Sequence, residues 1–112
     1  MSGVIHWTDD PAVWKGEFEG YRHYSGVAII FATLEPGEPG PKLHKHPYSE
    51  TFVVRRGRAL FIAGDKRIEA EAGDIVVVPP DTPHCFANAG LGTLEMMDIH
   101  ASERFATIWL GG

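Results

Sequence analysis

Two stretches of the sequence decide the fold: residues 44–57 read HKHPYSETFVVRRG, and residues 73–88 read GDIVVVPPDTPHCFAN. The first stretch places His44 and His46 two residues apart, with Glu50 four residues further on. Residues at even spacing on a strand point to the same face. If the strand continues past Pro47 without a bulge, these three side chains therefore look the same way. The second stretch passes through a proline pair and brings His84 in on a separate strand.

Short apolar runs separated by Gly- and Pro-rich turns extend on both sides of these stretches. Turn signals every 8–12 residues are typical of an all-β sandwich or barrel. Helix signals are limited to one turn over 12–14, where Asp10-Pro11 suits a helix start, and one at 102–104. We therefore expect an all-β fold with at most one or two short helical turns and with strands at 27–34, 51–54, 59–62, 67–70, 75–78, 85–87, 94–99 and 105–110.

Composition limits the class of protein. A chain of 112 residues predicts a single domain over 1–112. Its formal net charge of −5 argues against nucleic acid or an anionic membrane as the main partner. No run approaches the roughly 18 apolar residues of a membrane span, and the N-terminus does not resemble a signal peptide. A lone Cys85 suits a reducing compartment, so a cytoplasmic location is expected.

Three imidazoles and one carboxylate form a nitrogen and oxygen ligand set. Such a set suits Fe(II), Mn(II), Ni(II), Cu(II) or Zn(II), and it contains no thiolate that would favour tetrahedral zinc. Four protein ligands on a six-coordinate metal leave two positions for substrate, water or dioxygen. Taken alone, the pattern of His44, His46 and Glu50 arises by chance often enough that ligation and a structural role stand as equal alternatives.

The spacing of the surrounding residues favours ligation. His44, His46, Glu50 and Gly57 match the first motif of the cupin superfamily, over about residues 37–57. Gly73, Pro79, His84 and Asn88 match the second motif, over about residues 73–88. The chain thus resembles a small single-domain cupin.

Two positions depart from the family motifs, because Glu38 and Asp81 stand where Gly is usual. Gly37 and Gly40 are close enough to supply the first turn, and Asp tolerates turn conformations better than most residues. Both departures fall in loops rather than at the four polar positions.

The resemblance implies a small antiparallel jelly-roll β-barrel that holds one divalent transition metal (Fe, Mn, Ni, Cu or Zn), with His44, His46, Glu50 and His84 as ligands. It also implies a metal-dependent enzyme acting on a small organic molecule, through dioxygenase-type or Lewis-acid isomerase or lyase chemistry. A non-catalytic module that binds or senses a small molecule is the alternative, and a metal-free structural barrel is a third. Fold alone does not decide among them.

Several further residues face the expected pocket. Phe52 and Val54 share the parity of Glu50, and Phe86 shares that of His84. Asp98 shares a face with Met96, and it is a speculative general base if that face points inward. An outward, solvated Asp98 is the alternative. Apolar walls with few polar groups are the usual build of a small-molecule site.

The remaining candidates receive structural interpretations. His6, His23 and His100 lie outside both motifs, and we expect surface or supporting roles for them. Cys85 follows His84 and should face away from the metal as a small buried side chain. Asn88 is expected to be a structural turn residue, and Met96, Met97, Phe105 and Trp109 are expected in the core or pocket wall. A homodimer is expected, with Trp7, Trp14 and the strand at 27–34 as candidate interface.

Overall fold

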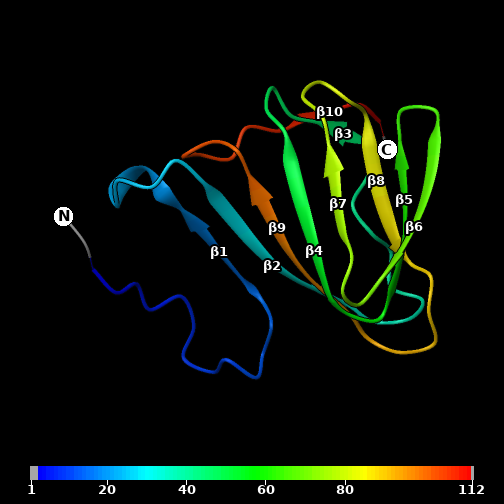
Figure 1. The fold of residues 1–112 in the computed structure, drawn as a ribbon, viewed down its shortest axis with the longest axis horizontal. Coiled ribbons are helices and arrows are strands. Elements are labelled where there is room, and N and C mark those ends of the chain that lie inside the picture. Colours follow the sequence, from blue (N-terminus) through cyan, green and yellow to red (C-terminus); the bar gives the residue numbers. More distant parts are fainter. Residues whose placement is uncertain (1–2, 112) are drawn as a thin grey trace.

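Alternating burial along the strands shows which face of each sheet packs inward. In β9 (Leu94–His100), every second residue from Leu94 onward is buried, and β4 (Glu50–Arg56) shows the same alternation at its start. This pattern is expected for strands that cover a core with one face only. The computed structural model describes residues 3–111, and it forms two antiparallel sheets of five strands each (Figure 1).

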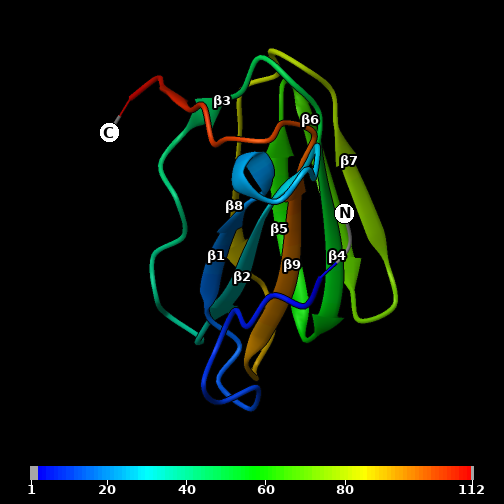
Figure 2. The same ribbon diagram turned by 90° about the vertical axis from the view of Figure 1, so that its left-hand side faces the viewer.

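The ten strands divide evenly between the sheets. In spatial order, the first sheet contains β1 (Gly16–Glu19), β2 (Ala28–Leu34), β9, β4 and β7 (Ile75–Val78). The second contains β10 (Ile108–Trp109), β3 (His44–Lys45), β8 (His84–Asn88), β5 (Arg58–Ala63) and β6 (Lys66–Glu71). Consecutive strands β4 and β5 belong to different sheets, as do β7 and β8, so the chain crosses repeatedly between the layers (Figures 1 and 2). The expected all-β jelly-roll class is confirmed.

Apolar side chains from both sheets meet between them. Phe52 of β4 and Phe61 of β5 are fully buried, and their ring centroids lie 4.8 Å apart in an edge-to-face arrangement. Burial of each such ring contributes about 1.5–3 kcal/mol to folding. Phe52 shares β4 with Glu50, so packing of this core also fixes the strand that carries the Glu50 carboxylate.

Two tight turns depend on unusual backbone conformations. Gly57 joins β4 to β5 with φ +85°, and a Cβ there would lie 2.4 Å from the carbonyl oxygen of Thr93. Asp81, which stands where the family motif has Gly, adopts φ +58°, and its amide donates to the carbonyl of His46 at 2.8 Å. The departure at position 81 therefore keeps the left-handed turn. Gly37, with φ +84°, supplies the turn beside Glu38.

Aromatic residues from the N-terminal segment cover the outer side of the first sheet. The Trp7 ring stacks on Phe31 at 3.7 Å between centroids, and the Trp14 indole N–H donates to the carbonyl of Met96. The Arg55 guanidinium lies 3.9 Å from the centroid of Trp14. The residues expected at a dimer interface thus already pack within one chain, and dimerisation stays a prediction.

Three local expectations were wrong. Strand β1 was not predicted, because its four residues GEFE at 16–19 contain a single apolar side chain and do not form an apolar run. The last predicted strand, 105–110, shrinks to the two residues Ile108–Trp109, and Phe105 and Thr107 precede it as irregular chain that lines the polar site. The short helix lies at Gly20–Arg22 (η1), whereas 12–14 and 102–104 form turns and bends. Within residues 3–111, no helix is long and apolar enough to cross a membrane.

Candidate metal centre

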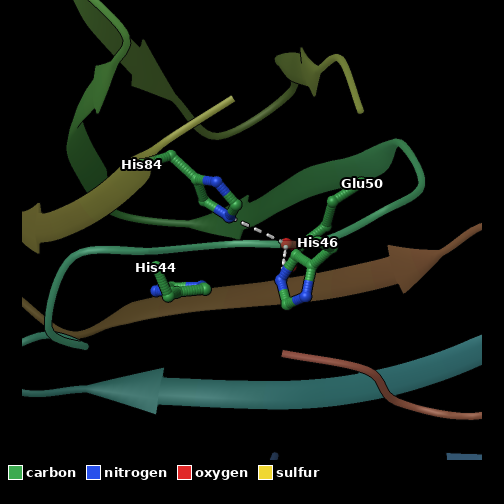
Figure 3. A group of neighbouring side chains, drawn as sticks. All are labelled: His44, His46, Glu50 and His84. Carbon is green, nitrogen blue, oxygen red and sulfur yellow. Dashed lines mark hydrogen bonds and ion pairs between the residues drawn. The ribbon is translucent and has the colours of Figure 1, made fainter. Parts of the chain in front are cut away.

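The four predicted ligands come together from both sheets. His44 on β3 pairs directly with His84 on β8 in the second sheet, whereas Glu50 begins β4 in the first sheet. Residues 46–49 lie between β3 and β4 and carry the chain across. The three side chains of His44, His46 and Glu50 do come together, but they do not share one face of a single strand as expected. The side chains converge because they face each other across the space between the sheets (Figure 3).

The geometry of the four residues is compact. One ligand atom from each of His44, His46, Glu50 and His84 lies within 4.8 Å of the others, and all four residues are buried. The Oε1 atom of Glu50 lies 3.0 Å from Nε2 of His46 and 3.0 Å from Nε2 of His84 (Figure 3). Such spacing leaves the imidazole nitrogens and the carboxylate oxygen around a common centre.

Backbone carbonyls fix the orientation of all three imidazoles. Nδ1 of His44 lies 2.6 Å from the carbonyl of Lys42, Nδ1 of His46 lies 2.8 Å from that of Ala106, and Nδ1 of His84 lies 2.8 Å from that of Thr82. A carbonyl oxygen can only accept, so each Nδ1 carries the proton and donates it. In the neutral imidazole, each Nε2 then presents a bare lone pair to the centre. Metal-binding histidines are typically oriented this way.

This tautomer creates an electrostatic conflict that a cation resolves. A bare Nε2 and a carboxylate oxygen 3.0 Å apart direct lone pairs at each other, unless each imidazole gains a second proton. Nε2 of His46 is buried without a directed hydrogen bond, although Glu50 is close. Burying such groups unpartnered is costly. A divalent metal at the centre would satisfy all of these atoms at once, so the residues fit the implied ion.

The pKa values of the site reflect burial and mutual contact. Burial lowers the pKa of His44. Burial also opposes the charge of His46, but contact with Glu50 and the Ala106 carbonyl outweighs it and raises the pKa. Burial likewise opposes the charge of Glu50, yet contact with His100, and with His46 and His84 when these carry a second proton, holds its pKa well below the usual range. The Glu50 carboxylate is therefore ionised and available as a ligand.

A buried chain of polar groups holds the second oxygen of Glu50. Nε2 of His100 lies 3.2 Å from Oε2 of Glu50, off the direction of a good hydrogen bond. Nδ1 of His100 lies 2.7 Å from the Tyr48 hydroxyl, which also accepts from the Ala106 amide at 3.1 Å. Because the ionised carboxylate of Glu50 only accepts, the proton of the neutral His100 ring belongs on Nε2, and Nδ1 then accepts from the Tyr48 hydroxyl. Oε1 is thereby left for the centre.

Sequence reasoning did not identify Tyr48 as part of the site and gave His100 only a surface or supporting role. His100 continues the inward parity of Met96 and Asp98, so extending that pattern by two residues would have indicated it. No spacing pattern links Tyr48 to His100, because the contact depends on how residues 46–49 cross between sheets.

A cavity of about 410 Å³ opens beside the four residues. Its wall includes three of them, His44, His46 and Glu50, together with His100. The apolar part comes from both sheets, the loop before β3 and the C-terminal segment, namely Ile30, Ala32, Pro41, Phe86, Phe105 and Trp109. Ligand sites commonly have this size and this balance of apolar wall and few polar groups. Phe105 and Trp109 line the pocket and Met96 lies in the core, both as expected.

Asp98 faces inward and lines the same cavity. Its side chain is 4% exposed, and its Oδ1 atom has no hydrogen-bond partner among the described residues. Burial raises its pKa well above the usual range, and the charge of Glu50 adds to the effect. The outward, solvated alternative is excluded, and an uncharged carboxyl suits hydrogen bonding better than the removal of a proton.

The other candidates lie away from the centre. His6 is exposed beside Asp9 at 3.0 Å, and the exposed His23 stacks on Phe18. Cys85 alternates with His84 and points away from the centre, but it is half-buried rather than buried. Asn88 has the structural role expected of it, because its amide donates to the carbonyls of Leu34 and Gly92.

Comparison with known proteins agrees with this architecture. The model of the family described as "Cupin domain" matches residues 30–100. A protein of Methanocaldococcus jannaschii with no assigned function is 36% identical over 76 residues, covering 66% of this chain and 61% of the relative. Acireductone dioxygenase of Geobacillus kaustophilus is 34% identical over 90 residues, covering 67% and 50%. The chain thus spans about half to three fifths of the length of these relatives.

Solved structures show the same fold. A structure of Bacillus subtilis oxalate decarboxylase, a protein with Mn(II) centres, superposes with a TM-score of 0.78 at 23% identity, over 85% of this chain and 27% of that one. Lactobacillus farciminis oxalate decarboxylase superposes with a TM-score of 0.75 at 19% identity, over 88% and 32%. At these identities the likeness concerns the fold alone.

Proposed function

The chain belongs to the cupin domain family, and from this premise we propose that it is a metal-dependent enzyme acting on a small organic molecule. His44, His46, Glu50 and His84 would hold one divalent transition metal. When bound, the metal would supply either redox chemistry with dioxygen or Lewis-acid polarisation of a substrate carbonyl. Dioxygenase-type chemistry is the first choice, because the relatives at 34% identity include acireductone dioxygenases.

One observation carries the proposal: three buried imidazoles are held by their Nδ1 atoms so that their Nε2 atoms face an ionised carboxylate. A purely structural cluster would pair donors with acceptors. Here the inward atoms are all acceptors when the imidazoles are neutral, which is the arrangement that binds a cation.

The chain's other residues supply binding and exclusion of water. The apolar wall next to the centre, including Phe86, Phe105 and Trp109, leaves room for a small molecule. Removal of water from such a site strengthens electrostatic interactions within it. The contact of His100 with Oε2 of Glu50 keeps the carboxylate in one orientation.

Oxygen consumption tests the proposal directly. Protein reconstituted separately with Fe(II), Mn(II), Ni(II), Cu(II) or Zn(II) would be mixed with enolic and catecholic compounds in an oxygen electrode. We expect at least one redox metal to support uptake that the Glu50→Ala variant lacks. Metal binding without uptake or any isomerase or lyase turnover would instead support the alternative of a non-catalytic binding module, which the apolar cavity favours.

A further inference from the structure

The cavity wall includes a buried carboxyl, that of Asp98, which the metal centre does not use. Oδ1 of Asp98 is buried and has no partner among the described residues. Its direct neighbours across the sheet are apolar, because Asp98 pairs with Ile30 on β2 and with Phe52 on β4. A buried carboxyl among apolar side chains destabilises the fold unless it finds a partner. The open side of Asp98 is the cavity, so a molecule there can be that partner.

The position of Asp98 on β9 separates it from the metal centre along the strand direction. Asp98 precedes His100 by two residues on β9 and shares its inward face, and His100 pairs with Glu50. Two strand residues span roughly 7 Å. A molecule that approaches the centre with one end would therefore reach Asp98 with a group several bonds away.

The charges of the cavity limit the character of that molecule. Among the described residues that line it, none is Lys or Arg, and the acidic ones outside the candidate ligands are Asp98 and Glu17. A carboxylate at the far end would find no cation and would lie beside an acid. A hydroxyl group both donates and accepts, so it matches a carboxyl in either protonation state.

We propose that Asp98 is the recognition residue of this cavity, and that it selects a small uncharged molecule that chelates at one end and carries a hydroxyl group several bonds away. The proposal rests on the proposed metal-dependent function, because the chelating end requires the metal. It goes beyond that function by defining the substrate class.

Three catechols that differ only at one substituent test the proposal. 4-Methylcatechol, 4-(hydroxymethyl)catechol and 3,4-dihydroxybenzoate place a methyl, a hydroxyl or a carboxylate at the far end. Each would be titrated calorimetrically, without oxygen, into protein loaded with redox-inert Zn(II). We expect the hydroxymethyl compound to bind about tenfold more tightly than the methyl compound, the effect of one buried hydrogen bond. The carboxylate should bind most weakly.

Variants separate recognition from simple charge. Asp98→Leu should abolish the preference for hydroxymethyl over methyl, and Asp98→Asn, which keeps an acceptor and a donor, should restore most of it. Glu17→Gln removes an exposed acid from the same cavity and should leave the preference unchanged. Zinc content, measured in every variant, should stay at about one ion per chain.

The outcomes distinguish the two proposals. Wild-type protein that takes up no zinc would contradict the metal-dependent function and this inference with it. Normal zinc content with an unchanged preference in Asp98→Leu and Asp98→Asn would overturn the inference alone. Tightest binding of the carboxylate, or loss of zinc in both Asp98 variants, would also overturn it, since Asp98 would then serve charge or the metal centre.

Discussion

Removal of a single hydroxyl group, in Tyr48→Phe, should weaken metal binding without touching any of the four candidate ligands. The hydroxyl donates to Nδ1 of His100 at 2.7 Å and accepts from the Ala106 amide at 3.1 Å. Without it, Nδ1 of His100 is buried and unpartnered, and the proton on Nε2 that faces Glu50 is no longer fixed. The Glu50 carboxylate is then free to turn away from the imidazoles.

The structure sets the size of the effect. The Ala106 amide is open to water, which replaces the Tyr48 hydroxyl as its partner, so loss of this hydrogen bond costs little. The buried Nδ1 of His100 finds no such replacement, and an unsatisfied buried polar group lowers the unfolding free energy by about 1–3 kcal/mol. Loss of a group that orients a metal ligand typically lowers metal affinity about 10–100-fold.

Two assays measure these quantities. Zn(II) affinity would be measured by competition with a fluorescent chelator, and unfolding of the metal-free protein by urea titration. Tyr24→Phe is the matched control, because that side chain is 88% exposed. Zinc affinity of Tyr48→Phe within threefold of wild type, with an unchanged urea midpoint, would refute the role given to Tyr48 and His100.

Three further outcomes are expected. Gly57→Ala should lower the unfolding free energy by about 2 kcal/mol or more, since the added Cβ would meet the Thr93 carbonyl. Gly73→Ala is the control and should lower it less, because φ is also positive there but the space is open. Equal urea midpoints for the two variants would contradict this steric explanation. Asp98→Leu should raise the unfolding free energy of the metal-free protein by about 1 kcal/mol, because it removes an unpartnered buried carboxyl; a lower thermal midpoint would be the opposite result. Zn(II) affinity should fall as the pH drops from 8 to 6, because the raised pKa of His46 lets a proton compete with the metal; chelator competition at each pH checks it, and a flat profile would exclude His46 as a ligand.

Spacing along the chain predicts the identity of the four central residues better than it predicts their geometry. The short apolar-rich runs at 75–78 and 94–99 were enough to place strands, and burial alternates along both of them. The path from His46 to Glu50 was not predictable, since it depends on which sheet each strand joins. Even spacing on a single strand pointed to His44, His46 and Glu50, whereas in the structure these residues meet because two sheets face each other.

Long-range contacts explain the rest of what the sequence could not show. The sequence placed Asp98 and Met96 on the same face of a strand, but it did not show whether that face points into the core or into solvent. Tyr48 meets His100 across 52 positions of the chain, and Trp14 meets Met96 across 82. Such pairings follow from sheet order, which local patterns do not encode.

Elemental analysis of untagged protein, purified without chelator, tests the central claim most directly. It would be run beside the Glu50→Ala/His84→Ala double variant, with circular dichroism to show that both proteins are folded. We predict about one transition-metal ion per chain in the wild type and none in the variant. Two folded proteins that both lack metal, and that take up none when Fe(II), Mn(II) or Zn(II) is added, would contradict the claim.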